Sequence, residues 1–237
     1  MGVAQTIPIR GDVGANVEHH VRLVHAAAEE RTQVLVFPEL SLTGYEIELA
    51  RELAFAEDDP RLSPLIDAAS SCAMTLIVGA PITAGSSLHI GAFIITPDRA
   101  IDLYTKHHLG AFSAGASCDG VVPPAEATVF QPGDRNPLVR FGDGTAAVAV
   151  CADTGRSSHP QAAADRGVST YLASMFVIPS EFEDETANLG PTPHSTPWRS
   201  RSRTTADPPE DSLPPGAARS GPRGASRSRD SMQTAPA

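Results

Sequence analysis

Three side chains that can do chemistry follow short apolar stretches of the sequence: Glu39, Lys106 and Cys151. A cysteine thiolate is a nucleophile, and a neighbouring ammonium group lowers the pKa of the thiol. A carboxylate can take the thiol proton and later pass it to a departing amine. The same ammonium group can stabilise the oxyanion of a tetrahedral intermediate. If the three side chains meet, they can perform nucleophilic acyl transfer.

Each of these residues, taken alone, also has a plainer explanation. Cys151 ends the apolar run 146–150, and most cysteines in such a place are inert members of a core. Glu39 would then be a solvated strand end, and Lys106 an exposed lysine of a hairpin. Packing alone, however, does not readily explain a charged residue directly after a buried strand. Open α/β sheets place their reacting groups at such strand ends.

The elements that must position these groups follow an α/β order. Residues 2–9 predict a short strand, and residues 17–31 predict an amphipathic helix with Asn16 as its N-cap. Residues 34–37 predict a buried strand, which completes a βαβ-type unit. Further helices are expected over 48–57, 64–74 and 159–166. Further strands are expected over 75–79, 89–96, 101–106, 138–141, 146–151 and 170–178, with a long loop over 107–137.

Composition narrows the class of protein and its partners. The chain has 237 residues, is 41% hydrophobic and carries a formal net charge of −10. One substantial core is therefore possible, whereas nucleic acid and anionic membrane surfaces are not expected as partners. Three scattered cysteines do not suit a disulfide framework or a zinc ribbon. Residues 1–6 fit an N-myristoylation pattern without a supporting basic cluster, and we expect a soluble cytoplasmic protein.

Residues 2–182 resemble the carbon–nitrogen hydrolase (nitrilase) superfamily. The blocks that carry the resemblance are Gly11-Asp12 with Ala15-Asn16, Phe37-Pro38-Glu39-Leu40-Ser41-Leu42-Thr43-Gly44-Tyr45, Tyr104-Thr105-Lys106-His107-His108-Leu109, Phe130-Gln131-Pro132-Gly133 and Cys151-Ala152-Asp153. The resemblance implies an α/β fold, a four-layer α-β-β-α sandwich of the nitrilase type. It also implies that no metal and no cofactor is used.

The resemblance assigns a role to five residues. Glu39 would be the general base, Lys106 would stabilise the tetrahedral intermediate, and Cys151 would be the nucleophile that forms an acyl-enzyme. Glu126 would position Lys106 and the substrate. The backbone N–H of Ala152 would be the second donor to the oxyanion.

The substrate is expected to be a small amide-type molecule. The resemblance also implies that the protein can form a homo-oligomer like those of the family. Tyr45, Met175 and Phe176 would contact it, the last two in the acyl pocket. An amidase is expected rather than a true nitrilase. The identity of the substrate does not transfer, because Ala152 stands where large residues are common and residues 158–161 replace the usual Phe-Pro-Glu. His107, His108 and His159 suggest a metal site, but no ligand set with suitable spacing is present.

Residues 190–237 change the character of the chain. They contain no Val, Ile, Phe, Tyr or Lys, nine of the 21 prolines, and seven arginines against four acids. This composition predicts a disordered tail after a hydrolase domain at 1–189 that lacks the family's last strands. An out-of-frame translation beginning near residues 188–190 would explain the composition, and a natural disordered tail is the alternative. The competing function is a truncated, inactive relative that acts as a fragment or binding protein.

Overall fold

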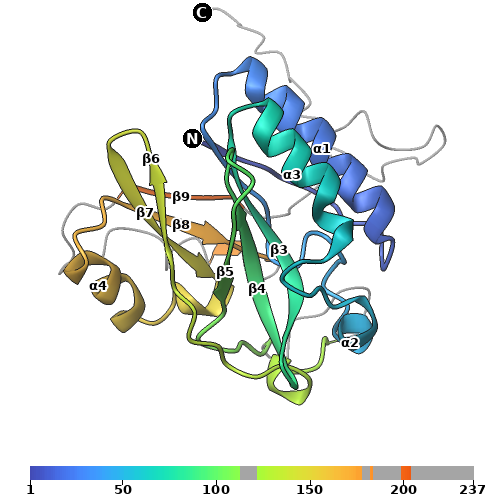
Figure 1. Cartoon of the computed structure of the whole chain (residues 1–237). Coiled ribbons are helices and arrows are strands. Elements are labelled where there is room, and N and C mark those ends of the chain that lie inside the picture. Colours follow the sequence, from blue (N-terminus) through green and yellow to red (C-terminus); the bar gives the residue numbers. More distant parts are fainter. Residues whose placement is uncertain (113–121, 178–181, 184–198, 204–237) are drawn as a thin grey trace, which may run out of the picture. The chain divides into compact units, whose positions relative to one another are not determined.

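Two β-sheets enclose an apolar core in the computed structural model (Figure 1). The first sheet has the order β1 (Gly2–Val3), β2 (Val34–Val36), β3 (Thr75–Ala84), β4 (Ser87–Ile95) and β5 (Ile101–Thr105). The second has the order β6 (Leu138–Phe141), β7 (Gly144–Val150), β8 (Thr170–Ser174) and β9 (Arg199–Arg203). The structure describes residues 1–112, 122–177, 182–183 and 199–203, all within the unit 1–206.

Helices cover the outer faces of both sheets. Helices α1 (Val13–Glu29) and α3 (Ser63–Ser71) lie side by side and share a core cluster with the first sheet (Figure 1). Helix α4 (Ser158–Asp165) packs against β7 and β8 of the second sheet. The result is the α-β-β-α order that the sequence predicts. None of the helices in the described ranges is long and apolar enough to cross a membrane.

The buried runs in the sequence reflect this layering. All three residues of β2 are buried, as expected of a parallel strand that is covered on both faces. In β7, Val148 and Val150 contribute to the core between the sheets, whereas Ala147 and Ala149 pack with α4. Successive side chains of a strand point to opposite faces. Small alanines on the outer face therefore let the helix approach the sheet.

The N-terminus of α1 differs from the prediction. Asp12, and not Asn16, is the N-cap, and its side chain accepts a backbone hydrogen bond from Ala15. Asn16 lies inside the helix and is buried, where its amide donates to the carbonyls of Ile9 and Leu42. The sequence offers two good capping residues four apart, and tertiary contacts select the first. Asn16 thus joins α1 to the loop that follows β2.

Several elements differ in length from their predicted ranges. The strand expected over 2–9 ends at Val3, and the helix expected over 48–57 is reduced to the turn η1 (Ile47–Leu49) and α2 (Ala50–Leu53). Strand β3 extends beyond 75–79 because it pairs with β4 as a long hairpin. Pairing between distant segments sets these boundaries, and local sequence propensity carries no information about that pairing.

Strand β9 lies in the segment 190–237, for which the composition predicts disorder. It pairs in parallel with β8, from Thr170 opposite Arg199 to Ser174 opposite Arg203. Pairing with an exposed sheet edge uses backbone groups only and needs no apolar side chains. For these five residues the expectation of disorder therefore does not hold. Residues 190–198 and 204–237 lie outside the described residues.

Gly79 of β3 provides a test of how the loop after β2 is packed. A Cβ atom at Gly79 would lie 2.6 Å from the Leu40 nitrogen and even closer to the Pro38 carbonyl oxygen. Gly79→Ala is expected to lower the free energy of unfolding by about 1–3 kcal/mol, measured by urea denaturation. Gly14→Ala, at an exposed position of α1, is the control and should raise it by about 0.5–1 kcal/mol. A Gly79→Ala variant as stable as the parent would contradict this packing.

Candidate active site

The three candidate catalytic side chains come from the ends of three strands. Glu39 follows β2, Lys106 follows β5 and Cys151 follows β7. Lys106 Nζ donates to Glu39 Oε1 at 2.7 Å, and both side chains are fully buried. Cys151 lies close enough to raise the pKa of Lys106 and to hydrogen-bond Glu39. The structure therefore brings together the three groups that the sequence singles out.

Glu126 is a second buried carboxylate on the same ammonium group. Its Oε1 accepts from Lys106 Nζ at 2.7 Å and from the Tyr45 hydroxyl at 2.6 Å. Its Oε2 accepts from the backbone N–H of Gly110 at 2.7 Å. Glu126 begins the turn η3 (Glu126–Thr128), and its side chain is 1% exposed. These strong contacts fix its position, as the expected role of holding Lys106 requires.

The electrostatic balance of the site follows from burial and from these contacts. Burial raises the pKa of Glu39 to about 7, and the nearby Lys106 opposes part of that shift. Burial alone would lower the pKa of Lys106, but Glu39, Cys151 and Glu126 together raise it above its ordinary value. Lys106 is therefore a permanent cation. Glu39 can exchange a proton near neutral pH.

Glu39 keeps one acceptor atom beside the thiol. Its Oε2 atom is buried and receives no hydrogen bond of ordinary geometry from the described residues. The Cys151 thiol nevertheless lowers the pKa of this carboxyl, so the two groups interact without satisfying that oxygen fully. A buried carboxylate oxygen whose hydrogen bonding is incomplete is unfavourable. This arrangement suits a group that accepts a proton during a reaction.

The segments that carry Glu39 and Cys151 each contain a strained residue. Cys151 has a φ of +42°, and Leu40, directly after Glu39, has a φ of +51°. Side chains other than glycine rarely adopt this left-handed region, and such strain costs about 1–3 kcal/mol and is common at active sites. Cys151 begins the turn η4 (Cys151–Asp153), so the N–H of Ala152 lies in its first turn. Amides there have no acceptor within the helix.

Aromatic rings lie beside the candidate catalytic groups. The ring of Tyr45 stacks on that of Phe176 with centroids 4.7 Å apart, and Phe112 meets both rings edge-on. The Phe176 carbonyl lies 3.9 Å from the Cys151 Sγ. Tyr45 and Phe176 thus lie beside the candidate catalytic groups, and Met175 is fully buried in a small apolar cluster with Ala173 and Val177. Phe112 was not predicted, because the loop that carries it has no periodic signal.

The three histidines of the suggested metal site do lie together. The rings of His107, His108 and His159 have centroids 5.1–6.4 Å apart. Two of them are occupied by other partners, since His108 bonds to Asp153 and His159 bonds to two tyrosine hydroxyls. Among the described residues, no three His, Cys, Asp or Glu side chains are arranged to hold a metal ion.

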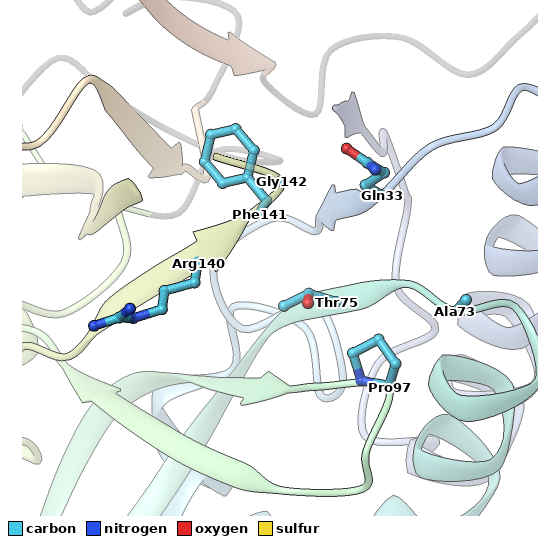
Figure 2. A pocket seen from close by; sticks show the side chains of 7 residues that line it. All are labelled: Gln33, Ala73, Thr75, Pro97, Arg140, Phe141 and Gly142. Carbon is cyan, nitrogen blue, oxygen red and sulfur yellow. The ribbon is translucent and has the colours of Figure 1, made fainter. Parts of the chain in front are cut away.

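A separate pocket lies at the other end of the sheets. It has a volume of about 210 Å³ and lies between the starts of β2 and β3 and the turn from β6 to β7 (Figure 2). Its lining residues are Gln33, Ala73, Thr75, Pro97, Arg140, Phe141 and Gly142. Arg140 is the one charged residue among them, so this pocket lacks the combination of groups that chemistry would need.

Comparison with known proteins identifies the family. The model of the family described as "Carbon-nitrogen hydrolase" matches residues 2–203. The chain belongs to the carbon–nitrogen hydrolase family. The match extends past residue 182, where the resemblance in the sequence ended.

Solved structures of amidases share the fold. An amidase from Nesterenkonia sp. AN1, with acrylamide added at its active-site cysteine, matches with a TM-score of 0.65 and 21% identity, over 77% of this chain and 68% of that chain. A cysteine-to-alanine mutant of that amidase in complex with butyramide matches with a TM-score of 0.63 and 20% identity, over 77% and 67% of the two chains. Related mutants are ascribed to the nitrilase superfamily. These likenesses establish a nitrilase-type α/β fold.

A curated relative is much longer than the matching part. The glutamine-dependent NAD(+) synthetase of Thermotoga maritima is 25% identical over 172 residues. The aligned part makes up 72% of this chain but only 28% of that relative.

Removal of the buried cation should be costly. Lys106→Met leaves Glu39 and Glu126 buried without a counter-charge, so we expect the free energy of unfolding at pH 8 to fall by about 3–5 kcal/mol. The loss should be smaller at pH 5, because Glu39, whose pKa burial raises to about 7, is then protonated and no longer needs a counter-charge. Arg135→Met, which breaks an exposed ion pair with Glu57, is the control and should cost about 0–1 kcal/mol. Equal urea midpoints for the Lys106 variant and the parent would contradict this electrostatic account.

Proposed function

We propose that the protein is an amidase that hydrolyses the carbon–nitrogen bond of a small, uncharged amide through a thioester on Cys151. Membership of the carbon–nitrogen hydrolase family supports the reaction class. The observation that carries the proposal is the buried Lys106 ammonium, 2.7 Å from Glu39 and 2.7 Å from Glu126, next to the thiol. A fold alone would not need such a group, because burying charges is costly.

In the first half of the proposed reaction, Glu39 takes the proton of the Cys151 thiol, and the thiolate attacks the carbonyl carbon of the amide. The carbonyl electron pair moves onto oxygen, where the Lys106 ammonium and the Ala152 N–H stabilise the charge. Glu39 then passes its proton to the amide nitrogen. The carbon–nitrogen bond breaks, ammonia or an amine departs, and the acyl group stays on sulfur as a thioester.

In the second half, water takes the place of the departed amine. Glu39 removes one proton from the water while its oxygen attacks the thioester carbon, and the same two donors hold the new oxyanion. The carbon–sulfur bond then breaks, Glu39 returns the proton to sulfur, and the carboxylic acid leaves. Glu126 keeps Lys106 in place throughout, because its Oε1 accepts from both the Lys106 ammonium and the Tyr45 hydroxyl.

The charges and rings of the site support small uncharged substrates. Two carboxylates surround one ammonium group, so the site disfavours a further negative charge from a substrate. The rings of Tyr45, Phe112 and Phe176 contact one another beside the nucleophile and offer an apolar surface. Acrylamide and butyramide bound to the structurally similar amidase are molecules of this kind.

A panel of amides tests the proposal directly. Ammonia release should be seen with acetamide, acrylamide or butyramide, and Cys151→Ala should reduce it to background while the melting temperature stays near that of the parent. The panel should also contain glutamine, a carbamoyl compound and a nitrile, because the same three groups can act on them. Cys72→Ala, which changes the cysteine beside His25, is the matched control and should keep full activity. Turnover that survives Cys151→Ala would exclude the mechanism, and a folded parent that hydrolyses nothing would favour an inactive binding relative.

The pH profile follows from the state of Glu39. Its pKa is raised to about 7, so the carboxylate that accepts the thiol proton predominates only above that pH. We expect kcat/KM to rise with pH to a plateau above about pH 7, and to be about 100-fold lower at pH 5. Measurement of ammonia release at several substrate concentrations from pH 5 to pH 9 gives this profile. A flat profile between pH 5 and pH 7 would contradict Glu39 as the base.

A further inference from the structure

A chain of buried polar side chains crosses between the two sheets behind Cys151. The Tyr171 hydroxyl lies 2.7 Å from His159 Nδ1, and His159 Nε2 lies 2.8 Å from the Tyr104 hydroxyl. The Tyr104 hydroxyl in turn lies 2.6 Å from Asp153 Oδ2. The four side chains come from β8, α4, β5 and η4, and all are buried. We call these four residues the polar chain.

The donor and the acceptor of each hydrogen bond in the polar chain can be assigned by starting from Asp153. Asp153 Oδ2 accepts from the N–H of Val150, and the Tyr104 hydroxyl donates its single proton to the same oxygen. The Tyr104 oxygen must then accept from a protonated His159 Nε2. The unprotonated Nδ1 accepts from Tyr171. Burial lowers the pKa of His159, and Asp153 opposes part of this shift. The ring therefore stays neutral, with Nε2 as the donor and Nδ1 as the acceptor.

Asp153 connects the polar chain to the segments that carry Cys151 and Lys106. Its Oδ2 also accepts from the N–H of Val150, the residue before Cys151, at 3.1 Å. Its Oδ1 accepts from the N–H of His108, two residues after Lys106, at 2.8 Å, and lies 2.9 Å from His108 Nδ1. One carboxylate with no exposed surface therefore bonds to the segments that carry the nucleophile and the cation.

We propose that His159, acting through Tyr104 and Asp153, is a positioning residue that holds the strained Cys151 junction in its reactive geometry. The catalytic role of Cys151 in this statement rests on the function proposed above. A left-handed residue persists only where surrounding contacts enforce it, and the bond from Val150 to Asp153 is such a contact. Asp153 could not hold Cys151 in this conformation if its own side chain were not fixed in orientation. A misplacement of about 1 Å in an active site can cost about 100-fold in rate.

The polar chain is more than a means of filling space. Apolar clusters flank the polar chain, and apolar residues in its place would fill the same volume without burying hydroxyl and imidazole groups. A buried polar network is stable only if every member is satisfied, so removal of one member disturbs the others. A chain of this kind is suited to fix orientation.

The test compares His159→Phe with His159→Gln in the full chain. Phenylalanine keeps a ring but no donor or acceptor, and we expect kcat to fall about 10–100-fold with KM changed less than about threefold. Alkylation of Cys151 by iodoacetamide, followed by peptide mapping, should slow by a similar factor. Glutamine offers an NH₂ group as donor and a carbonyl oxygen as acceptor, and it should restore a large part of both rates.

Val168→Ala is the matched control for a merely structural role. Val168 packs in the same cluster as Tyr171 under α4 but has no part in the polar chain. The substitution should lower the melting temperature while kcat and Cys151 alkylation stay near the parent values. Tyr104→Phe removes a single oxygen atom, and it serves as the deciding variant if His159→Phe does not fold. We expect it to show the same loss of kcat.

The outcomes separate this inference from the proposed function. A parent that releases ammonia and alkylates fastest at Cys151 supports the function. If the folded His159→Phe or Tyr104→Phe variant then matches that parent in both rates, the positioning role is overturned and the function stands. The positioning role is also overturned if His159→Phe lowers kcat no more than Val168→Ala does when both variants lose the same amount of melting temperature. A parent with neither hydrolysis nor preferential Cys151 alkylation overturns both.

Discussion

The buried ammonium of Lys106 is the interaction on which the rest of the site depends. Two carboxylates cannot stay ionised in a dry interior unless a cation lies between them, and Lys106 lies 2.7 Å from Glu39 and 2.7 Å from Glu126. The fold meets this requirement by ending β2, β5 and β7 at one place. The same cation lies beside Cys151, where an oxyanion would form in the proposed reaction. One charge thus explains how the two carboxylates can be buried, and it supports the proposed mechanism.

Much of the fold could be predicted from the sequence, because buried runs and amphipathic spacing survive in short windows. The order of strands and helices up to β8 was predicted correctly, and so was the sandwich, which the family resemblance implies; β9 was not predicted. The boundaries were not, since the pairing of β3 with β4 and of β8 with β9 joins segments that no local pattern connects. The cap of α1 was wrong for a related reason, because the buried bonds of Asn16 to Ile9 and Leu42 belong to tertiary structure.

The candidate site was predictable only where its residues stand in recognisable blocks. Glu39, Lys106 and Cys151 each follow an apolar strand, and a reactive side chain in that place is visible in the sequence itself. Phe112 lies in an irregular loop, and Asp153 and His159 act through hydrogen bonds that join distant segments. Met175 packs with Ala173 and Val177 in a small apolar cluster, and its expected contact with the substrate stays a prediction. Residue type alone does not reveal such orientations.

The most direct test of the account is the mass of the protein during turnover. The reaction with the amide that is hydrolysed fastest should be quenched in acid within milliseconds to seconds and analysed by intact-mass spectrometry and peptide mapping. We predict an increase equal to the acyl group, located on Cys151 and removed by hydroxylamine, as a thioester requires. Steady hydrolysis without any acyl adduct, or an adduct on Cys72 in place of Cys151, would contradict the account.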